Sequence, residues 1–287
     1  MSNHSETRQI ARIIPARATS DGAGVKIRRS LGQNYNERLD PFLMLDEFSS
    51  EDANDYIGGF PPHPHRGFET VTYMLDGHMR HEDHLGNRGD LRPGSVQWMT
   101  AGRGIIHSEM PQQESGRMRG FQLWVNLPAR EKMKPASYRD IDPAQIPNVS
   151  LDNGGQVKVI AGHLMVGEKA TDGPITGLST DPLYLDVYLP PGENFEQPID
   201  PSYNAFIYTY EGEAQIGDIS VPPHSVCVMG SGARIEVSTG LEGARFLLLA
   251  GRPIGEPIVQ HGPFVMNTQA EIDQAIHDYQ NGTLTQN

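Results

Sequence analysis

The two halves of this chain carry the same strand-and-turn pattern, and this internal repeat limits the folds that the chain can adopt. Tyr73-Met-Leu-Asp-Gly77 in the first half aligns with Tyr208-Thr-Tyr-Glu-Gly212 in the second. Further on, Pro93-Gly-Ser-Val-Gln-Trp-Met99 aligns with Pro223-His-Ser-Val-Cys-Val-Met229, and a glycine follows each block three residues later. Two copies of one pattern predict two domains of similar fold.

Short runs of β-branched and aromatic residues recur through both halves, and turn residues separate them. The chain has 31 glycines and 22 prolines, which are spread between these runs rather than gathered in one segment. Seven runs have the composition of strands: Thr70–Leu75, Val96–Met99, Phe121–Val125, Val157–Ile160, Leu183–Leu189, Phe206–Tyr210 and Phe246–Ala250. Many short strands with tight turns predict an all-β fold of sandwiches or barrels.

The end of the chain has the pattern of a helix. Thr268-Gln-Ala-Glu271 is a capping-box sequence, and Gly282 is a residue type that commonly ends a helix. Between them, four apolar residues fall on one helical stripe: Ile272, Ala275, Ile276 and Tyr279. We expect an amphipathic C-terminal helix that packs on a sheet.

The boundary between the two predicted domains falls in the segment that separates the repeats. Arg130–Asp142 is charged and flanked by prolines, and Gly154-Gly155 marks a turn. The prediction is an N-terminal domain of residues 1–145 and a C-terminal domain of residues 146–287, which ends in the helix.

Charge and cysteine content exclude several classes of protein. With 36 acidic and 23 basic residues, the formal net charge is −13, so the field of the molecule repels phosphate backbones and direct nucleic-acid binding is not expected. The single cysteine, Cys227, rules out an internal disulfide, a thiolate zinc cluster and an iron–sulfur centre within the chain. We interpret Cys227, which lies in a valine-rich run, as a buried apolar residue rather than a redox sensor.

The sequence has no feature of a secreted or membrane-spanning protein. Its first residues, MSNHSETRQIARII, contain no apolar core of a signal peptide, and no uninterrupted apolar run is long enough to span a bilayer. We therefore expect a cytoplasmic protein, in agreement with the single cysteine. Motifs of hydrolases and nucleotide-binding proteins, such as Gly-x-Ser-x-Gly and the Walker loop, do not occur.

Two short pairs of residues carry the strongest chemical signal. His63-Pro-His65 and His107-Ser-Glu109 each place two potential metal ligands at positions i and i+2. On a strand this spacing puts both side chains on one face. If the two strands lie side by side inside a barrel, three imidazoles and one carboxylate meet at one point. The sequence therefore predicts a site for one divalent metal ion, held by His63, His65, His107 and Glu109.

The repeat provides an internal comparison for these ligands. At the positions that align with the two pairs, the second half has Pro198-Ile-Asp200 and Val237-Ser-Thr239. Neither segment contains a histidine, although the strand pattern around it persists. We expect the C-terminal domain to keep the fold and to lack the metal site.

Two longer segments around these ligands resemble the signature blocks of a known family. The blocks are His63-Pro-His-Arg-Gly-Phe-Glu-Thr-Val-Thr-Tyr-Met-Leu75 and Gln97-Trp-Met-Thr-Ala-Gly-Arg-Gly-Ile-Ile-His-Ser-Glu109. They resemble the pirin family, which belongs to the cupin superfamily. Gly262-Pro-Phe-Val-Met-Asn-Thr268 is similar to the family's C-terminal segment, and the resemblance runs from about Pro41 to Gly282.

This resemblance implies a fold, a metal and an activity. The fold is a bicupin, that is, two jelly-roll-like β-barrels, with one mononuclear iron ion in the N-terminal domain on His63, His65, His107 and Glu109. The activity known for several pirins is dioxygenase cleavage of the flavonol quercetin. Animal members also have a nuclear cofactor role, for which the acidic balance of this chain and the lack of a basic run give no support.

The donor set is compatible with oxygen chemistry. Four side-chain ligands leave one or two coordination positions open for a substrate or dioxygen. Imidazole and carboxylate suit Fe(II), the expected metal, but they also accept Mn, Co, Ni, Cu or Zn. In the expected mechanism the metal binds the 3-hydroxyl oxygen of a small, flavonol-like aromatic substrate, while Glu109 takes the proton as ligand or base. The resulting enolate then reacts with O2.

Residues near the two pairs are assigned from their type and position. Glu69 and Asp83 are candidates to accept a hydrogen bond from a ring nitrogen of a ligand histidine. Three further histidines near the turn between the ligand blocks are interpreted as exposed loop residues rather than as a second metal site: His78, His81 and His84. Four apolar residues are interpreted as core, with the lining of a substrate pocket as the alternative: Phe68, Trp98, Met99 and Met110.

Three functions remain compatible with this sequence. The first is a metal-dependent dioxygenase acting on a flavonol or a similar enolisable aromatic. The second is a non-catalytic, redox-sensitive regulator in which the metal tunes an acidic surface that binds a protein partner. The third is another reaction of the cupin superfamily, such as an isomerisation. A metal cage serves all three, because function resides in the site and its pocket rather than in the fold.

Overall fold

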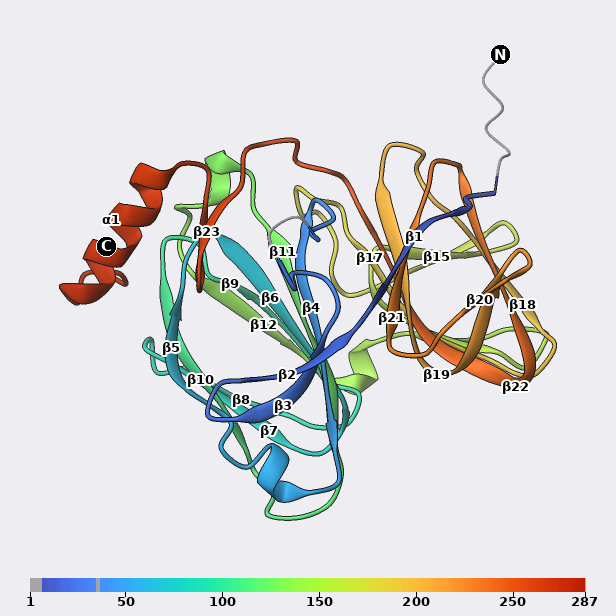
Figure 1. Ribbon diagram of the computed structural model, residues 1–287, viewed down its shortest axis with the longest axis horizontal. Coiled ribbons are helices and arrows are strands. Elements are labelled where there is room, and N and C mark those ends of the chain that lie inside the picture. The colour runs from blue at the N-terminus through green and yellow to red at the C-terminus, as the bar shows by residue number, and fades with distance from the viewer. Residues whose placement is uncertain (1–6, 35–36, 287) are drawn as a thin grey trace. The chain divides into compact units, whose positions relative to one another are not determined.

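A computed structural model describes residues 7–34 and 37–286 of the chain. Strands account for 55% of the structure and helices for 8%, so the predicted all-β fold is confirmed. Figure 1 shows these strands and the helix α1 (Gln269–Gln280) at the C-terminal end. In the part of the chain that the structure describes, no helix has the length and apolar character needed to cross a bilayer.

The chain divides into two compact units, and each unit joins segments that lie far apart in the sequence. The unit that we call N-terminal contains Arg17–Arg38, Phe42–Pro143 and the residues from Ile254 onwards. The unit that we call C-terminal contains the residues up to Ala16, Leu39–Pro41 and Ala144–Pro253. The division into residues 1–145 and 146–287 stays a prediction. The long segments of the two units meet at Pro143 and Ala144, and the two ends of the chain belong to opposite units, an exchange that contacts between residues far apart in sequence decide.

The strands of the N-terminal unit form two larger sheets and one two-stranded sheet. A seven-stranded sheet has the order β12-β9-β6-β11-β4-β3-β2, and a four-stranded sheet has the order β5-β10-β7-β8, while β23 pairs with β24. Their bounds are β2 (Arg17–Asp21), β3 (Val25–Arg29), β4 (Phe42–Ser50), β5 (Phe60–His65), β6 (Phe68–Asp76), β7 (Met79–Asp83), β8 (Arg88–Leu91), β9 (Val96–Thr100), β10 (Ile105–Pro111), β11 (Met118–Asn126), β12 (Ser137–Ile141), β23 (Val259–His261) and β24 (Phe264–Met266). Short 3-10 turns lie at Ala53–Asp55 and Ala129–Glu131.

The core of this unit includes a cluster with members from both larger sheets. Ile27, Phe48 and Met74 come from the seven-stranded sheet, and Met79 and Leu91 come from the four-stranded sheet. In β7 and β8 buried residues alternate with exposed or half-buried ones, as expected for strands with one face on the core. The inward face of the four-stranded sheet is therefore available for functional side chains.

The strands of the C-terminal unit form one large sheet and a hairpin. The sheet has the order β1-β21-β19-β22-β17-β14-β13, with β18 on β22 and β20 on β19, and β15 pairs with β16. The bounds are β1 (Ile10–Pro15), β13 (Asn148–Ser150), β14 (Gln156–Ala161), β15 (His163–Val166), β16 (Lys169–Asp172), β17 (Leu183–Leu189), β18 (Asn194–Pro198), β19 (Asn204–Ile216), β20 (Ile219–Val221), β21 (Ser225–Met229) and β22 (Arg234–Gly251). A 3-10 turn at Pro143–Gln145 lies where the chain passes between the units. Cys227 is fully buried in the core of this unit, as predicted.

The internal repeat of the sequence corresponds to equal strand pairing in the two units. In β6, Tyr73 pairs with Val96 of β9, and in β19, Tyr208 pairs with Val226 of β21. Each tyrosine and its partner valine come from the aligned blocks, so the repeat detected in the sequence is a repeat of structure. The predicted pair of similar β domains follows from this register.

The predicted C-terminal helix is also present. Thr268 caps α1, and the reciprocal hydrogen bonds of a capping box with Glu271 are both made. Ile272 and Ala275 pack in a cluster with Phe264 of β24 and Leu284. The helix thus covers a small two-stranded sheet of the N-terminal unit.

Candidate metal centre

The two predicted ligand pairs lie on neighbouring strands. β5 and β10 pair antiparallel, with His107 directly opposite His63 and Ile105 opposite His65. The donor atoms of His63, His65 and His107 lie within 4.8 Å of one another. His65 is 3% exposed and His107 is 2% exposed, so the cluster is largely shielded from water.

The ring nitrogens of this cluster face one another, and some of them lack hydrogen-bond partners among the described residues. His63 Nδ1 lies 2.8 Å from the carbonyl oxygen of Pro61, and since a carbonyl can only accept, Nδ1 carries the proton and Nε2 has the lone pair. That Nε2 atom is 3.1 Å from Nε2 of His65. Among the described residues, His107 Nε2 is buried and has no hydrogen-bond partner. Buried nitrogens without partners are unfavourable, and a cation shared by the three rings would satisfy them, so these residues fit a divalent metal.

Burial keeps the imidazoles in the form that binds metals. The pKa of His65 is well below its usual range because the ring is buried and because His63 is close. The pKa of His107 is also well below its usual range, first through burial and then through the neighbouring histidines. Both rings are therefore neutral near pH 7, and a neutral imidazole donates its lone pair to a metal without losing a proton.

Glu109, the fourth predicted ligand, lies outside the group formed by the three histidines. Its Oε1 accepts a hydrogen bond from Thr72 Oγ1 at 2.9 Å, and its Oε2 accepts one from Gln122 Nε2 at 2.8 Å. The pairing of β10 with β5 shifts register between His107 and Glu109, but its pairing with β7 is regular there and both residues are buried, so the two side chains keep the shared face that the i, i+2 spacing predicts. The assignment of Glu109 as a ligand stays a prediction.

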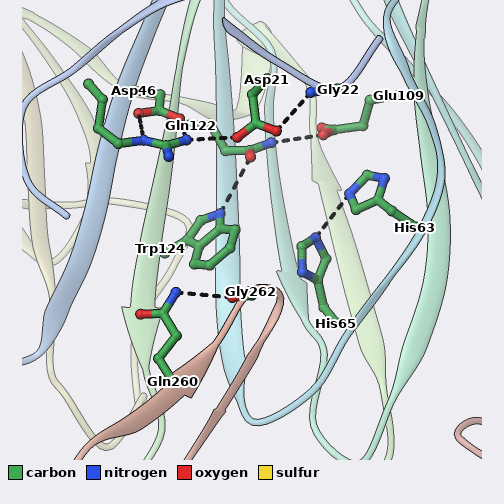
Figure 2. A network of polar contacts seen from close by, with 11 residues as sticks. Asp21, Gly22, Asp46, His63, His65, Glu109, Gln122, Trp124, Gln260 and Gly262 are labelled. Carbon is green, nitrogen blue, oxygen red and sulfur yellow. Dashed lines mark hydrogen bonds and ion pairs between the residues drawn. The ribbon is translucent and has the colours of Figure 1, made fainter. Parts of the chain in front are cut away.

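A short chain of hydrogen bonds holds this carboxylate. Figure 2 shows Gln122 between Glu109 and Trp124. Trp124 Nε1 lies 3.4 Å from Gln122 Oε1, and because an indole can only donate, the oxygen of the Gln122 amide faces Trp124. The amide nitrogen must then face Glu109, so this contact fixes the direction of the hydrogen bond to the carboxylate.

A cavity of about 910 Å³ opens beside His63 and His65. This volume is in the range of sites for small molecules. Its apolar wall comes mainly from β4, β5 and β11: Leu43, Met44, Phe60, Pro61, Pro62 and Trp124. Its polar wall includes Gln33, Asn34, Gln122 and Gln260.

The four apolar residues singled out from the sequence do not line this cavity. Phe68, Trp98 and Met99 are at most 4% exposed, which confirms their interpretation as core. Phe68 packs against Trp124, with ring centroids 4.3 Å apart, and thereby supports the wall from behind. Met110 is half-buried and is not part of the wall.

An ion-pair cluster occupies another side of the cavity. The guanidinium of Arg29 donates to both carboxylate oxygens of Asp46, at 2.8 and 2.6 Å, and to Asp21 at 2.8 Å (Figure 2). Burial raises the pKa of Asp46 to about 6, against the opposing effect of Arg29. Since two carboxylates hold the cation, Arg29 forms a fixed polar wall rather than a free anion-binding group.

Two family models match this chain. The model described as Pirin matches residues 24–125, and the model described as Pirin C-terminal cupin domain matches residues 184–285. The chain belongs to the pirin family. The predicted resemblance is thus confirmed, and the two matched segments lie in the two halves that carry the internal repeat.

Similarity to individual members of the pirin family covers nearly the whole chain. A pirin-like protein of Caulobacter vibrioides is 51% identical over 275 residues, which are 96% of this chain and 98% of the relative. A Pseudomonas aeruginosa protein, provisionally named quercetin 2,3-dioxygenase, is 50% identical over 279 residues, with 96% and 98% covered. The crystal structure of a quercetin 2,3-dioxygenase from Acinetobacter baumannii has a TM-score of 0.88 at 31% identity, covering 97% of this chain and 99% of that one. The bicupin architecture expected of a pirin is therefore confirmed.

Around the histidine cluster of this pirin-family chain, one of the sequence interpretations is wrong. His81 is not an exposed loop residue, because it lies on β7 with 0% exposure and its Nδ1 is 3.2 Å from His107 Nδ1. The segment taken as a turn forms the paired strands β7 and β8, and alternation places His81 on the buried face with Met79. His84 is exposed in a turn as predicted, and His78 is half-buried and bonded to Asp90 at 2.8 Å.

The two carboxylates proposed to support the ligands have different surroundings. Glu69 accepts hydrogen bonds from Trp98 Nε1 at 3.1 Å and from Thr100 Oγ1 at 2.7 Å, so both its oxygens are engaged away from the histidines. Asp83 accepts from Asn87 Nδ2 at 2.9 Å and lies 3.9 Å from His81 Nε2. Asp83 therefore lies next to His81, which contacts His107, and it is not bonded directly to one of the predicted ligand histidines.

Sequence reasoning missed Gln122, Trp124 and Thr72 as functional neighbours of Glu109. All three lie in runs that were predicted only as strands. A polar residue such as Gln122 within the apolar run Phe121–Val125 is a signal for a buried polar role, but the sequence does not name its partner.

Proposed function

We propose that this chain is a metal-dependent dioxygenase of the pirin type, which opens the ring of quercetin or a similar flavonol with O2. The single observation that carries the proposal is the convergence of His63, His65 and His107 beside the cavity of about 910 Å³. A metal site that borders a cavity of substrate size is the arrangement that catalysis requires, whereas a structural metal site is closed by its ligands.

The proposed metal ligands are His63, His65 and His107 through their Nε2 atoms, with Glu109 as the fourth. Fe(II) is the expected ion, and a divalent transition metal bound there supplies a Lewis acid with open coordination positions and redox chemistry with O2. The protein contributes three imidazoles that already converge, two of them buried, so little rearrangement is needed when the site is loaded.

In this proposal Glu109 receives the proton of the flavonol 3-hydroxyl group at its carboxylate. Thr72 and Gln122 hold the two oxygens, and Trp124 in turn fixes the amide of Gln122. Each carboxylate oxygen has two lone pairs, and one hydrogen bond from a neutral donor uses only one of them. The carboxylate thus keeps its orientation and can still accept the proton of a substrate. The apolar wall of Leu43, Met44 and Trp124 suits the flat face of an aromatic ligand and keeps water from the site.

The decisive experiment uses the full chain, purified without oxygen, with its metal content measured and then set to one Fe(II) per chain. We expect O2 uptake with quercetin, and incorporation of both atoms of ¹⁸O2 into the product. The variant His107→Gln should lose both metal and uptake, while His84→Gln, which changes an exposed histidine, should keep both. Full occupancy without uptake across several flavonols and metals would overturn the dioxygenase assignment in favour of the non-catalytic regulator.

A further inference from the structure

His81 lies in the core of the N-terminal unit, in contact with the proposed metal ligand His107. β7 and β10 pair so that His81 is opposite Glu109 and Asp83 is opposite His107. The side chain of His81 is 0% exposed, and its ring stacks on Tyr138 with centroids 5.7 Å apart. A buried ring nitrogen without a partner is unfavourable, and among the described residues His81 Nε2 has no hydrogen-bond partner.

The contact between the two imidazoles has a direction. Nδ1 of His107 and Nδ1 of His81 are 3.2 Å apart, so one of the two nitrogens carries the proton and the other accepts it. If His81 were the donor, neutral His107 would carry its own proton on Nε2, the atom that lies in the histidine cluster, and could not offer a lone pair there. If His107 is the donor, its Nε2 has the lone pair, and His81, which accepts at Nδ1, carries its proton on Nε2.

Asp83 favours the second arrangement. Its Oδ2 lies 3.9 Å from His81 Nε2, and both side chains are shielded from solvent. A carboxylate next to this nitrogen is attracted to an N–H group and repelled by a lone pair. Asp83 is itself held in place, because it accepts hydrogen bonds from Asn87 Nδ2 at 2.9 Å and from the backbone nitrogen of Leu85 at 2.9 Å.

We propose that His81, oriented by Asp83, is a positioning residue that fixes the ring and the tautomer of His107. At 3.9 Å the Asp83 carboxylate acts on His81 Nε2–H through its charge rather than through a hydrogen bond. His107 Nδ1–H donates to His81 Nδ1, so that His107 Nε2 is left with its lone pair in the cluster. This inference rests on the proposed function only in taking His107 as a metal ligand. It needs no statement about the substrate.

The test compares two variants of similar shape. His81→Asn keeps an oxygen near the position of Nδ1, whereas His81→Leu has similar size and no acceptor. The readouts are the dissociation constant of Co(II) for the full chain, measured against a chelator, the visible spectrum of the bound Co(II), and the urea-induced unfolding of the metal-free protein. We expect His81→Leu to weaken Co(II) binding about 10- to 100-fold with a changed spectrum, and His81→Asn to stay within a few-fold of the unsubstituted protein.

Two results would overturn the proposal. One is unchanged Co(II) affinity in His81→Leu, and the other is an equal loss in both variants, which would point to packing alone. If His81→Leu does not fold, long-range ¹H–¹⁵N spectra of the unsubstituted protein, metal-free and zinc-loaded, decide the question. We expect the proton of His81 on Nε2, and a proton on Nδ1 would contradict the assignment. Normal Co(II) binding without flavonol oxidation would count against the proposed function and leave the role of His81 standing.

Discussion

The guanidinium of Arg66 lies 2.8 Å from the carboxylate of Asp278, although 212 positions separate the two residues in the chain. Arg66 directly follows the proposed ligand His65, and Asp278 lies on α1. Arg66 also donates to the carbonyl oxygens of Arg103 and Leu284. The C-terminal helix is thus tied to the strand that carries two of the three clustered histidines.

We expect Asp278→Asn to destabilise the chain by about 3 kcal/mol, because it leaves Arg66, which is 4% exposed, without its counterion. Urea-induced unfolding of the metal-free protein would measure the change. The matched control is Asp273→Asn on the same helix, whose carboxylate is exposed and bonded to Gln269, and which should change stability by less than about 0.5 kcal/mol. Equal losses of stability in the two variants would show that the ion pair of Arg66 with Asp278 contributes no more than an exposed side-chain contact.

A fragment of residues 1–150 should fail to fold, because it lacks the segment from Ile254 onwards that belongs to the N-terminal unit. Val265 packs against Phe68 and Trp124, and its carbonyl accepts from the buried Lys132 Nζ at 3.0 Å. A Cβ on Gly67 would lie 2.0 Å from the same carbonyl oxygen, which shows how closely the tail approaches the strand that follows β5. Circular dichroism and Co(II) binding would test the fragment.

The control for this fragment joins residues 254–287 to it through a flexible glycine-serine linker. We expect this second fragment to be folded and to bind Co(II). A soluble, folded and metal-binding fragment of residues 1–150 alone would contradict the assignment of the tail to this unit.

Replacing Glu109 by Gln should leave much of the metal bound and lower kcat for quercetin by at least about 100-fold, because the amide cannot take the substrate proton. Metal content and O2 uptake of the same preparation would be measured together. Glu82→Gln, which changes an exposed residue on β7, is the matched control and should retain full turnover. Unchanged turnover in Glu109→Gln would remove Glu109 from the proposed mechanism.

Gln122→Leu should lower kcat about tenfold or more with little change in Co(II) affinity, because it removes the donor that holds Glu109 Oε2. Trp124→Phe keeps an aromatic wall and removes only the indole N–H, so we expect a smaller, few-fold loss. Steady-state kinetics of both variants would test this order. A larger effect of Trp124→Phe than of Gln122→Leu would show that the aromatic wall, and not the amide, controls the site.

When the pH rises above 9, the free energy of unfolding of the unsubstituted protein should fall more than that of the variant Cys227→Ala. Burial raises the pKa of the Cys227 thiol from 9.0 to about 12, so between these values the folded state keeps the proton and the unfolded chain loses it. The unfolded state is then favoured as the pH rises, by about 1.4 kcal/mol at pH 10. Urea-induced unfolding at pH 8 and pH 10 would compare the two proteins, and parallel losses would show that the thiol does not contribute.

Local spacing explains what could be predicted for the histidine cluster. The side chains of His63 and His65 share one face because their separation equals the period of a strand, and this relation is written in the sequence. The same spacing puts His107 and Glu109 on the buried face of β10, but it does not decide what the Glu109 carboxylate contacts, which depends on side chains of other strands such as Thr72 and Gln122. His81 was misjudged for a similar reason, since its burial depends on the pairing of β7 with β8 and β10 and not on its neighbours in the chain.

By itself the sequence determined the all-β class, the repeat, the capped helix and the three histidines that cluster, because each of these depends on residues only a few positions apart or on the comparison of two aligned segments. The exchange of the chain ends, the contact of His81 with His107 and the cavity wall of Leu43, Met44 and Trp124 were decided by the tertiary structure. These features join strands that are distant in sequence, and strand register, which is set by packing across the whole sheet, decides which of their side chains meet.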